Sequence, residues 1–136
     1  MNTDPLARAV RDGAQRVLVV TARDGTGLPE QLHEHVARSP AEVLVVAPAL
    51  NSPLRQWLSD VDGARRTAED RALRCVADLR LAGFEAEGVV GDPDPAQAID
   101  DALVLFDADV LVLDGELADR ARRNAHLHIV PLHHAA

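Results

Sequence analysis

The chain has 136 residues, of which 47% are hydrophobic, an ordinary size and composition for a protein that buries one core without disulfides or metals. Its formal net charge is −8, whereas a nucleic-acid interface needs clustered positive charge, so we expect no nucleic-acid partner. All 14 basic residues are Arg, which excludes the chemistry of Schiff-base and P-loop lysines.

The first half of the chain alternates apolar runs with helical patterns. Asp4 and Pro5 predict a short helical extension within residues 1–15, because Asp caps a helix and Pro favours its first position. Arg16–Val20 and Val43–Val46 are continuous apolar runs rich in Val, typical of strands buried on both faces. Between these two runs a four-residue spacing predicts a helix at Leu28, Leu32 and Val36.

The second half continues the alternation. A stripe at helical spacing predicts a long helix from about Ala64 to Ala82, followed by a less regular strand over Phe84–Val90. Asp94 and Pro95 form a second capped helix start, and Val110–Leu113 is another buried strand. The last predicted elements are a short helix over 116–124 and a fifth strand over Leu127–Leu132.

This order of elements predicts a single α/β domain over residues 1–136, a doubly wound, three-layer α/β/α sandwich with a mostly parallel five-stranded sheet. No run approaches the roughly 20 apolar residues of a membrane helix, and the first 15 residues lack the core of a signal peptide. The single cysteine, Cys75, suits a reducing compartment. We therefore expect a cytoplasmic protein without a membrane partner.

Three features together resemble the universal stress protein family. They are the order of the elements, the long crossover after the second predicted strand, and the segment from Gly91 to Ile99, which is close to the G-x-P-x-x-x-I pattern that this family often carries. The resemblance covers roughly Arg16 to Leu132. It implies an adenine nucleotide alpha hydrolase-like arrangement with strand order 3-2-1-4-5, and a role in stress response or regulation.

The sequence departs from this family after the fourth predicted strand. ATP-binding members carry a G-x-x-G stretch there and a later G-S/T pair, whereas this chain has Gly115 and no further glycine up to its end. Asp114, Glu116 and Asp119 would instead bring carboxylates toward a phosphate, and like charges repel. We therefore predict a non-catalytic domain that needs no cofactor and does not bind ATP in the family's usual manner.

A degenerate nucleotide or anion site is the alternative interpretation. A glycine-containing turn follows the first predicted strand, where doubly wound folds often bind phosphate, but the position of the third fingerprint glycine is Glu30. The same turn is equally readable as a plain loop. No nucleophile with a base and no complete set of metal ligands is recognisable, so neither catalytic nor metal-binding residues are predicted. If a nucleotide binds, the candidate residues are Asp24, Gly25, Gly27, Gly91 and Gly115.

The C-terminal strand is predicted to lie at an edge of the sheet, where unpaired backbone groups recruit another chain. Proteins of the family that the chain resembles pair this last strand antiparallel across a two-fold axis. Pro131 removes one donor and limits the shared ladder to the residues before it. The resemblance thus implies a homodimer through Leu127, Ile129 and Val130.

Overall fold

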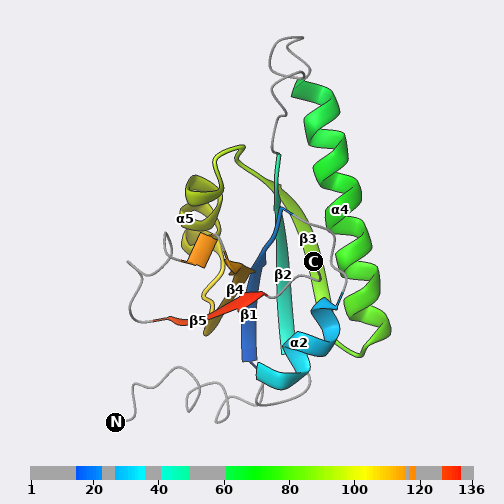
Figure 1. Cartoon of the computed structure of the whole chain (residues 1–136), viewed down its shortest axis with the longest axis vertical. Helices are drawn as coiled ribbons and strands as arrows, with labels where there is room; N and C mark the ends of the chain where they lie inside the picture. The colour runs from blue at the N-terminus through cyan, green and yellow to red at the C-terminus, as the bar shows by residue number, and fades with distance from the viewer. Residues whose placement is uncertain are drawn as a thin grey trace.

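The computed structural model contains a five-stranded, wholly parallel sheet with helices on both faces (Figure 1). It describes residues 15–22, 27–35, 41–49, 61–115, 117–118 and 127–132. The predicted extension before residue 15 and most of the predicted helix over 116–124 lie outside these residues. The strands are β1 (Gln15–Val20), β2 (Ala41–Pro48), β3 (Glu85–Gly91), β4 (Val110–Asp114) and β5 (His128–Leu132).

The strand order β3-β2-β1-β4-β5 confirms the predicted topology. β1 lies at the centre and pairs with β2 on one side and β4 on the other, in a register that places Val20 beside both Val46 and Leu113. β3 and β5 are the two edges. The continuous apolar runs of β1, β2 and β4 are explained by this placement, because central parallel strands are covered on both faces.

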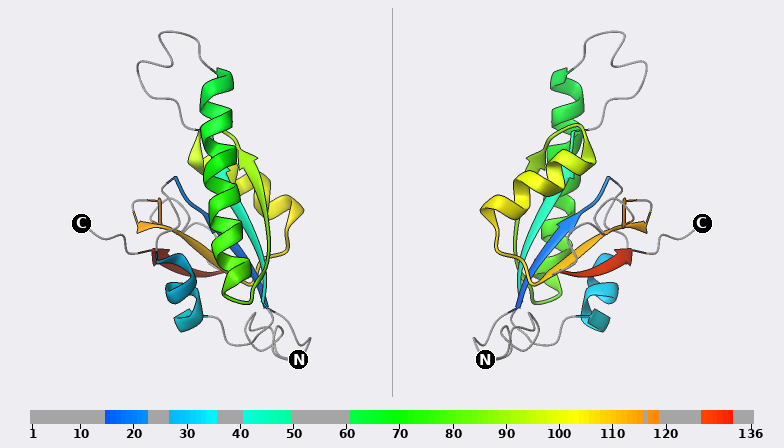
Figure 2. Two further views of the ribbon diagram at one scale, coloured as in Figure 1. Left: turned by 90° about the vertical axis from the view of Figure 1, so that its right-hand side faces the viewer. Right: turned by 90° about the vertical axis from the view of Figure 1, so that its left-hand side faces the viewer.

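Within the described residues, three helices form the outer layers of the molecule (Figure 2). α2 (Leu28–His35) and α4 (Val61–Leu81) pack on one face of the sheet, whereas α5 (Pro95–Leu105) packs on the other. The helix predicted from about Ala64 thus begins three residues earlier, at Val61. None of the described helices is long and apolar enough to cross a bilayer.

Alternate residues of β1 belong to two separate apolar layers. Val17 and Val19 face α2 and α4, whereas Leu18 and Val20 face α5, and all four are fully buried. This alternation follows from the two-residue period of a strand. The single cysteine, Cys75, lies on α4 within the first layer and is buried.

Polar contacts hold the amino-terminal end of the sheet. The backbone of Arg16 donates to the buried carboxylate of Asp109 at 3.0 Å and accepts from the Asp109 amide at 2.8 Å. The Arg16 guanidinium pairs with Glu42 at 3.0 Å and lies 4.3 Å from the centre of the Phe106 ring. These contacts join β1 to β2 and to the segment before β4 at this end of the sheet.

Candidate functional site

The carboxyl ends of β1 and β4 mark the point where the strand order reverses. Chain connections leave these two neighbouring strands in opposite directions, and parallel α/β sheets bind ligands in the crevice that such a reversal creates. Val20 pairs with Leu113, so the next residues, Thr21 and Asp114, meet at the base of this crevice. This part of the molecule is therefore the candidate site.

Asp114 occupies the base of the crevice with a fully buried carboxylate. One oxygen accepts from the hydroxyl of Thr21 at 2.9 Å, and the other accepts from the backbone amide of Ala22 at 2.8 Å. The amide of Thr21 in turn donates to the carbonyl of Val46 at 3.2 Å. The ends of β2, β1 and β4 are thus joined by hydrogen bonds within the protein itself.

The hydrogen bond from the Ala22 amide to Asp114 occupies a donor that could otherwise bind a phosphate group. The Ala22 amide stands just beyond β1, where backbone amides of nucleotide-binding folds face phosphate. Here the amide is bonded to an acidic side chain, and a buried carboxylate is stabilised only when such donors satisfy it. An approaching phosphate would have to break these bonds and would meet a negative charge.

Gly27 directly precedes α2, the helix that follows β1 in the chain. Its φ of +78° lies in the left-handed region, which glycine adopts without strain, and its carbonyl accepts from the Gln31 amide at 3.1 Å. Leu28 and Leu32 fix the helix by inserting into the apolar layer beneath it. Two further predicted site residues, Asp24 and Gly25, lie outside the described residues.

Gly115 and Gly91 lie at the same end of the sheet but over different strands. Gly115 follows β4 directly, and a Cβ built on it would lie 3.7 Å from the carbonyl oxygen of Leu132. Gly91 ends β3, three strands away from β4, which at a spacing of about 4.8 Å per strand separates them by roughly 14 Å. The structure thus places Gly115 at the crevice and Gly91 well to one side.

Close packing gives Gly91 a structural role. A Cβ on this residue would lie 2.7 Å from Cγ1 of Val46 and 2.9 Å from Cβ of Ala98, both nearer than real contacts allow. The glycine therefore lets α5 approach β2 and β3. The turn after it is held by Asp94, whose side chain accepts from the Ala96 amide at 3.1 Å as the predicted cap of α5.

The bonding of Asp114 to Thr21 and Ala22 was missed in the sequence analysis, which treated Asp114 only as a charge that repels phosphate. A usable signal was present, because Thr21 and Asp114 are each the first polar residue after an apolar strand. Two polar side chains at the same level of adjacent parallel strands are expected to meet. Of the other predicted carboxylates, Glu116 and Asp119 lie outside the described residues.

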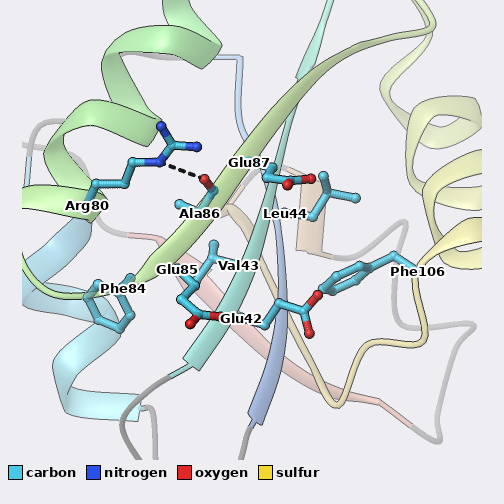
Figure 3. Close-up of a pocket in the computed structure, with 9 residues that line it drawn as sticks. All are labelled: Glu42, Val43, Leu44, Arg80, Phe84, Glu85, Ala86, Glu87 and Phe106. Atoms are coloured by element: carbon cyan, nitrogen blue, oxygen red, sulfur yellow. Dashed lines mark hydrogen bonds between the residues drawn. The ribbon is translucent and has the colours of Figure 1, made fainter.

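A second hollow, of about 500 Å³, lies at the opposite end of β2 and β3 (Figure 3). Glu42, Leu44 and Phe106 line it on one side of β2. Arg80 lines it from the α4 side and donates to the Ala86 carbonyl at 2.9 Å. Its lining holds no hydroxyl or thiol nucleophile. Within the described residues no three His, Cys, Asp or Glu side chains are placed to hold a metal ion.

The comparisons with known proteins find similar structures but no similar family model or curated protein. No protein-family model matches the chain, and no curated protein matches it. A universal stress protein family protein from Arabidopsis thaliana, solved with AMP bound, superimposes with a TM-score of 0.64 at 14% identity, over 90% of this chain and 93% of that one.

Two further solved structures have the same arrangement. Hypothetical protein MJ0577, the subject of a structure-based assignment of biochemical function, gives a TM-score of 0.67 at 8% identity over 89% of this chain and 96% of its own. A universal stress protein family member from Burkholderia pseudomallei gives 0.55 at 17% identity over 85% and 94%. The three matches, together with the strand order, show that this chain has the fold of the universal stress proteins.

Proposed function

We propose that the chain is a non-catalytic regulatory domain with the universal stress protein fold that does not bind ATP in the usual manner of that family. One observation carries the proposal: the Asp114 carboxylate, buried at the strand-order reversal, accepts from the Ala22 amide and the Thr21 hydroxyl. The shortage of glycines after β4 supports it independently, because Gly115 is the last glycine in the sequence.

The absence of catalysis is supported by the chemistry of the described residues. The Thr21 hydroxyl, which stands at the crevice, is buried and already donates to Asp114. The Cys75 thiol is buried in the apolar layer under α4, an environment that keeps a thiol protonated and inert. A substrate would therefore meet neither an accessible nucleophile nor a metal held by these residues.

Calorimetric titration with Mg-ATP and with AMP tests the proposal. We expect no binding at micromolar concentrations, because a bound phosphate would have to replace the internal hydrogen bonds of Asp114. A micromolar dissociation constant for either nucleotide contradicts the proposal.

The alternative, a degenerate nucleotide or anion site, is favoured by the left-handed glycine that directly precedes α2, the helix following β1. It is separated from the first proposal by thermal-shift measurements with ATP, AMP and inorganic phosphate on two variants. Gly27→Ala and Gly83→Ala both force alanine into positive φ, at +78° and +96°, but Gly83 lies at the far end of α4. A stabilising shift that survives in Gly83→Ala and disappears in Gly27→Ala supports the alternative.

We further infer that two chains associate through β5. β5 is an edge of the sheet, with His128 and Pro131 exposed and Ile129 partly buried. Antiparallel pairing of this edge with a second copy would satisfy its outer backbone groups up to Pro131. Sedimentation equilibrium at tens of micromolar should give twice the 14.6 kDa mass of one chain, and a monomer there contradicts the inference.

A further inference from the structure

The opposite edge of the sheet, β3, presents outward backbone groups. Gly91 directs its carbonyl toward β2, where it accepts from the Ala49 amide at 3.1 Å. Because backbone groups alternate in direction along a strand, Gly88 and Val90 direct theirs away from β2. Among the described strands none lies on that side. The Ala86 carbonyl also points outward, and there the Arg80 side chain bonds it (Figure 3).

An open groove runs beside this edge, between β3 and α4. Its volume is about 770 Å³, and its floor is apolar where Gly88 lies directly under α4. Leu73 projects into the groove with 67% of its surface exposed, an unusual exposure for so large an apolar side chain. The groove has an apolar part made of Ala72, Leu73, Val76, Gly88 and Val90. The charged side chains of Arg65, Glu69 and Arg80 on α4 also line it.

The other face of the same edge is acidic. Glu85 and Glu87 point to the α5 side of β3 together with Val89, which is 47% exposed. Their register neighbours on β2 are Glu42 and Leu44. Arg16 forms an ion pair with Glu42. Among the described residues, neither Glu85 nor Glu87 forms an ion pair with a basic group within 4 Å. A strand beside β3 would therefore have an apolar surface on one side and an acidic surface on the other.

We propose that the β3 edge is a docking site for an extended segment of a partner protein in which apolar and basic residues alternate. Side chains of an added strand point alternately to the two faces of the sheet. One set would enter the α4 groove against Leu73 and Val76, and the other would face Glu85 and Glu87. Backbone hydrogen bonds between the partner segment and Gly88 and Val90 would supply affinity. The difference between the two faces of β3 would determine which partner sequences bind.

The dimensions of the groove and the strand agree. The lining of α4 extends from Arg65 to Arg80, which corresponds to about 22 Å of helix. The seven residues of β3 span about 23 Å. A segment of about six or seven residues, roughly the span of β3, is therefore the expected length of the ligand.

A second copy of this chain is a poor occupant of the same edge. If two β3 strands paired antiparallel about Gly88, the Glu85 and Glu87 carboxylates of both copies would lie on one face of the joined sheet. Their repulsion opposes that assembly, whereas Lys or Arg side chains of a different segment would relieve it. The charge of the edge thus favours a basic partner over self-association.

Fluorescence anisotropy with a labelled Lys-Val-Lys-Val-Lys-Val-Lys peptide tests the proposal on the full chain. We expect micromolar binding that weakens at high salt, and no binding of the matched Glu-Val peptide. Leu73→Glu should weaken binding about tenfold or more, because it places a charge in the apolar groove. Leu81→Glu is the control, since Leu81 is on the same helix and even more exposed, at 88%, but does not line the groove.

Reversing the charge of the β3 edge distinguishes specific from nonspecific peptide binding. Glu85→Lys combined with Glu87→Lys should transfer the preference from the Lys-Val to the Glu-Val peptide, whereas Glu30→Lys on α2 should not. Amide hydrogen exchange should slow at Gly88 and Val90 when the Lys-Val peptide binds. The proposal is overturned by three results: no binding, binding unchanged in Leu73→Glu, or a Leu73→Glu variant that loses self-association instead of peptide affinity.

Discussion

Asp114 shows how one residue can both stabilise the fold and close a binding crevice. Its carboxylate accepts hydrogen bonds from the buried Thr21 hydroxyl and from the Ala22 amide. The same bonds occupy the carboxyl end of β1, where the crevice has its base. Stability and the loss of a ligand contact therefore depend on the same atoms.

We predict that Asp114→Ala lowers the free energy of unfolding by about 2–4 kcal/mol, because the two donors lose a charged acceptor in a buried position. Urea denaturation at neutral pH measures the effect. Asp78→Ala, which removes an exposed carboxylate from α4, should change stability by less than about 0.5 kcal/mol. A similar small loss in Asp114→Ala would show that its hydrogen bonds contribute little.

Gly91 illustrates a residue whose importance comes from the space around it. We predict that Gly91→Ala lowers the free energy of unfolding by about 1–3 kcal/mol, because its Cβ would meet Val46 and Ala98 at less than 3.0 Å. Gly115→Ala is the matched control, since its Cβ meets nothing closer than 3.7 Å. Equal unfolding midpoints for the two variants in urea would argue against the packing explanation.

At the scale of elements, α5 is positioned by its cap as well as by its apolar stripe. Asp94 adopts an extended backbone before the helix and accepts from Ala96, while Ala98, Ile99 and Ala102 pack on the sheet. We predict that Asp94→Ala costs about 1 kcal/mol and speeds hydrogen exchange in the first turn of α5. Asp100→Ala, on the exposed side of the same helix, should leave that exchange unchanged.

The elements that sequence patterns predicted well are those whose environment is uniform. β1, β2 and β4 are covered on both faces and appear as unbroken apolar runs, so periodicity alone located them. β3 is an edge strand that contains two exposed glutamates and a glycine packed under α4, and its pattern is correspondingly irregular. The hydrophobic pattern of an edge strand therefore predicts its position less clearly than that of a central strand.

The candidate site was less accessible to sequence reasoning than the fold. Glycines after strands suggested where a ligand would bind, and of these Gly115 directly follows β4 at the crevice. The bonding of Thr21 to Asp114, however, joins residues 93 positions apart and depends on the register of β1 against β4. No local pattern encodes that register, because it is set by packing of the whole sheet.

Across the whole molecule, the two edges of the sheet differ in chemistry. β5 is short and contains Pro131, whereas β3 has seven residues, no proline, and an acidic face beside an apolar groove. A homodimer through β5 would leave β3 accessible on both copies. Such an assembly would present two identical docking edges, which favours partners that carry two suitable segments.

The central place of β1 also has a consequence for synthesis. Its two neighbours are far apart in the chain, so β2 and β3 are made long before β4. Until β4 emerges from the ribosome, β1 exposes an apolar edge from Val17 to Val20, and such an edge pairs readily with other chains. A fragment that ends at Gly91 should therefore aggregate under conditions in which the full chain remains dispersed, and light scattering would measure it. We expect the newborn chain to be most prone to aggregation during the interval between the synthesis of β1 and that of β4.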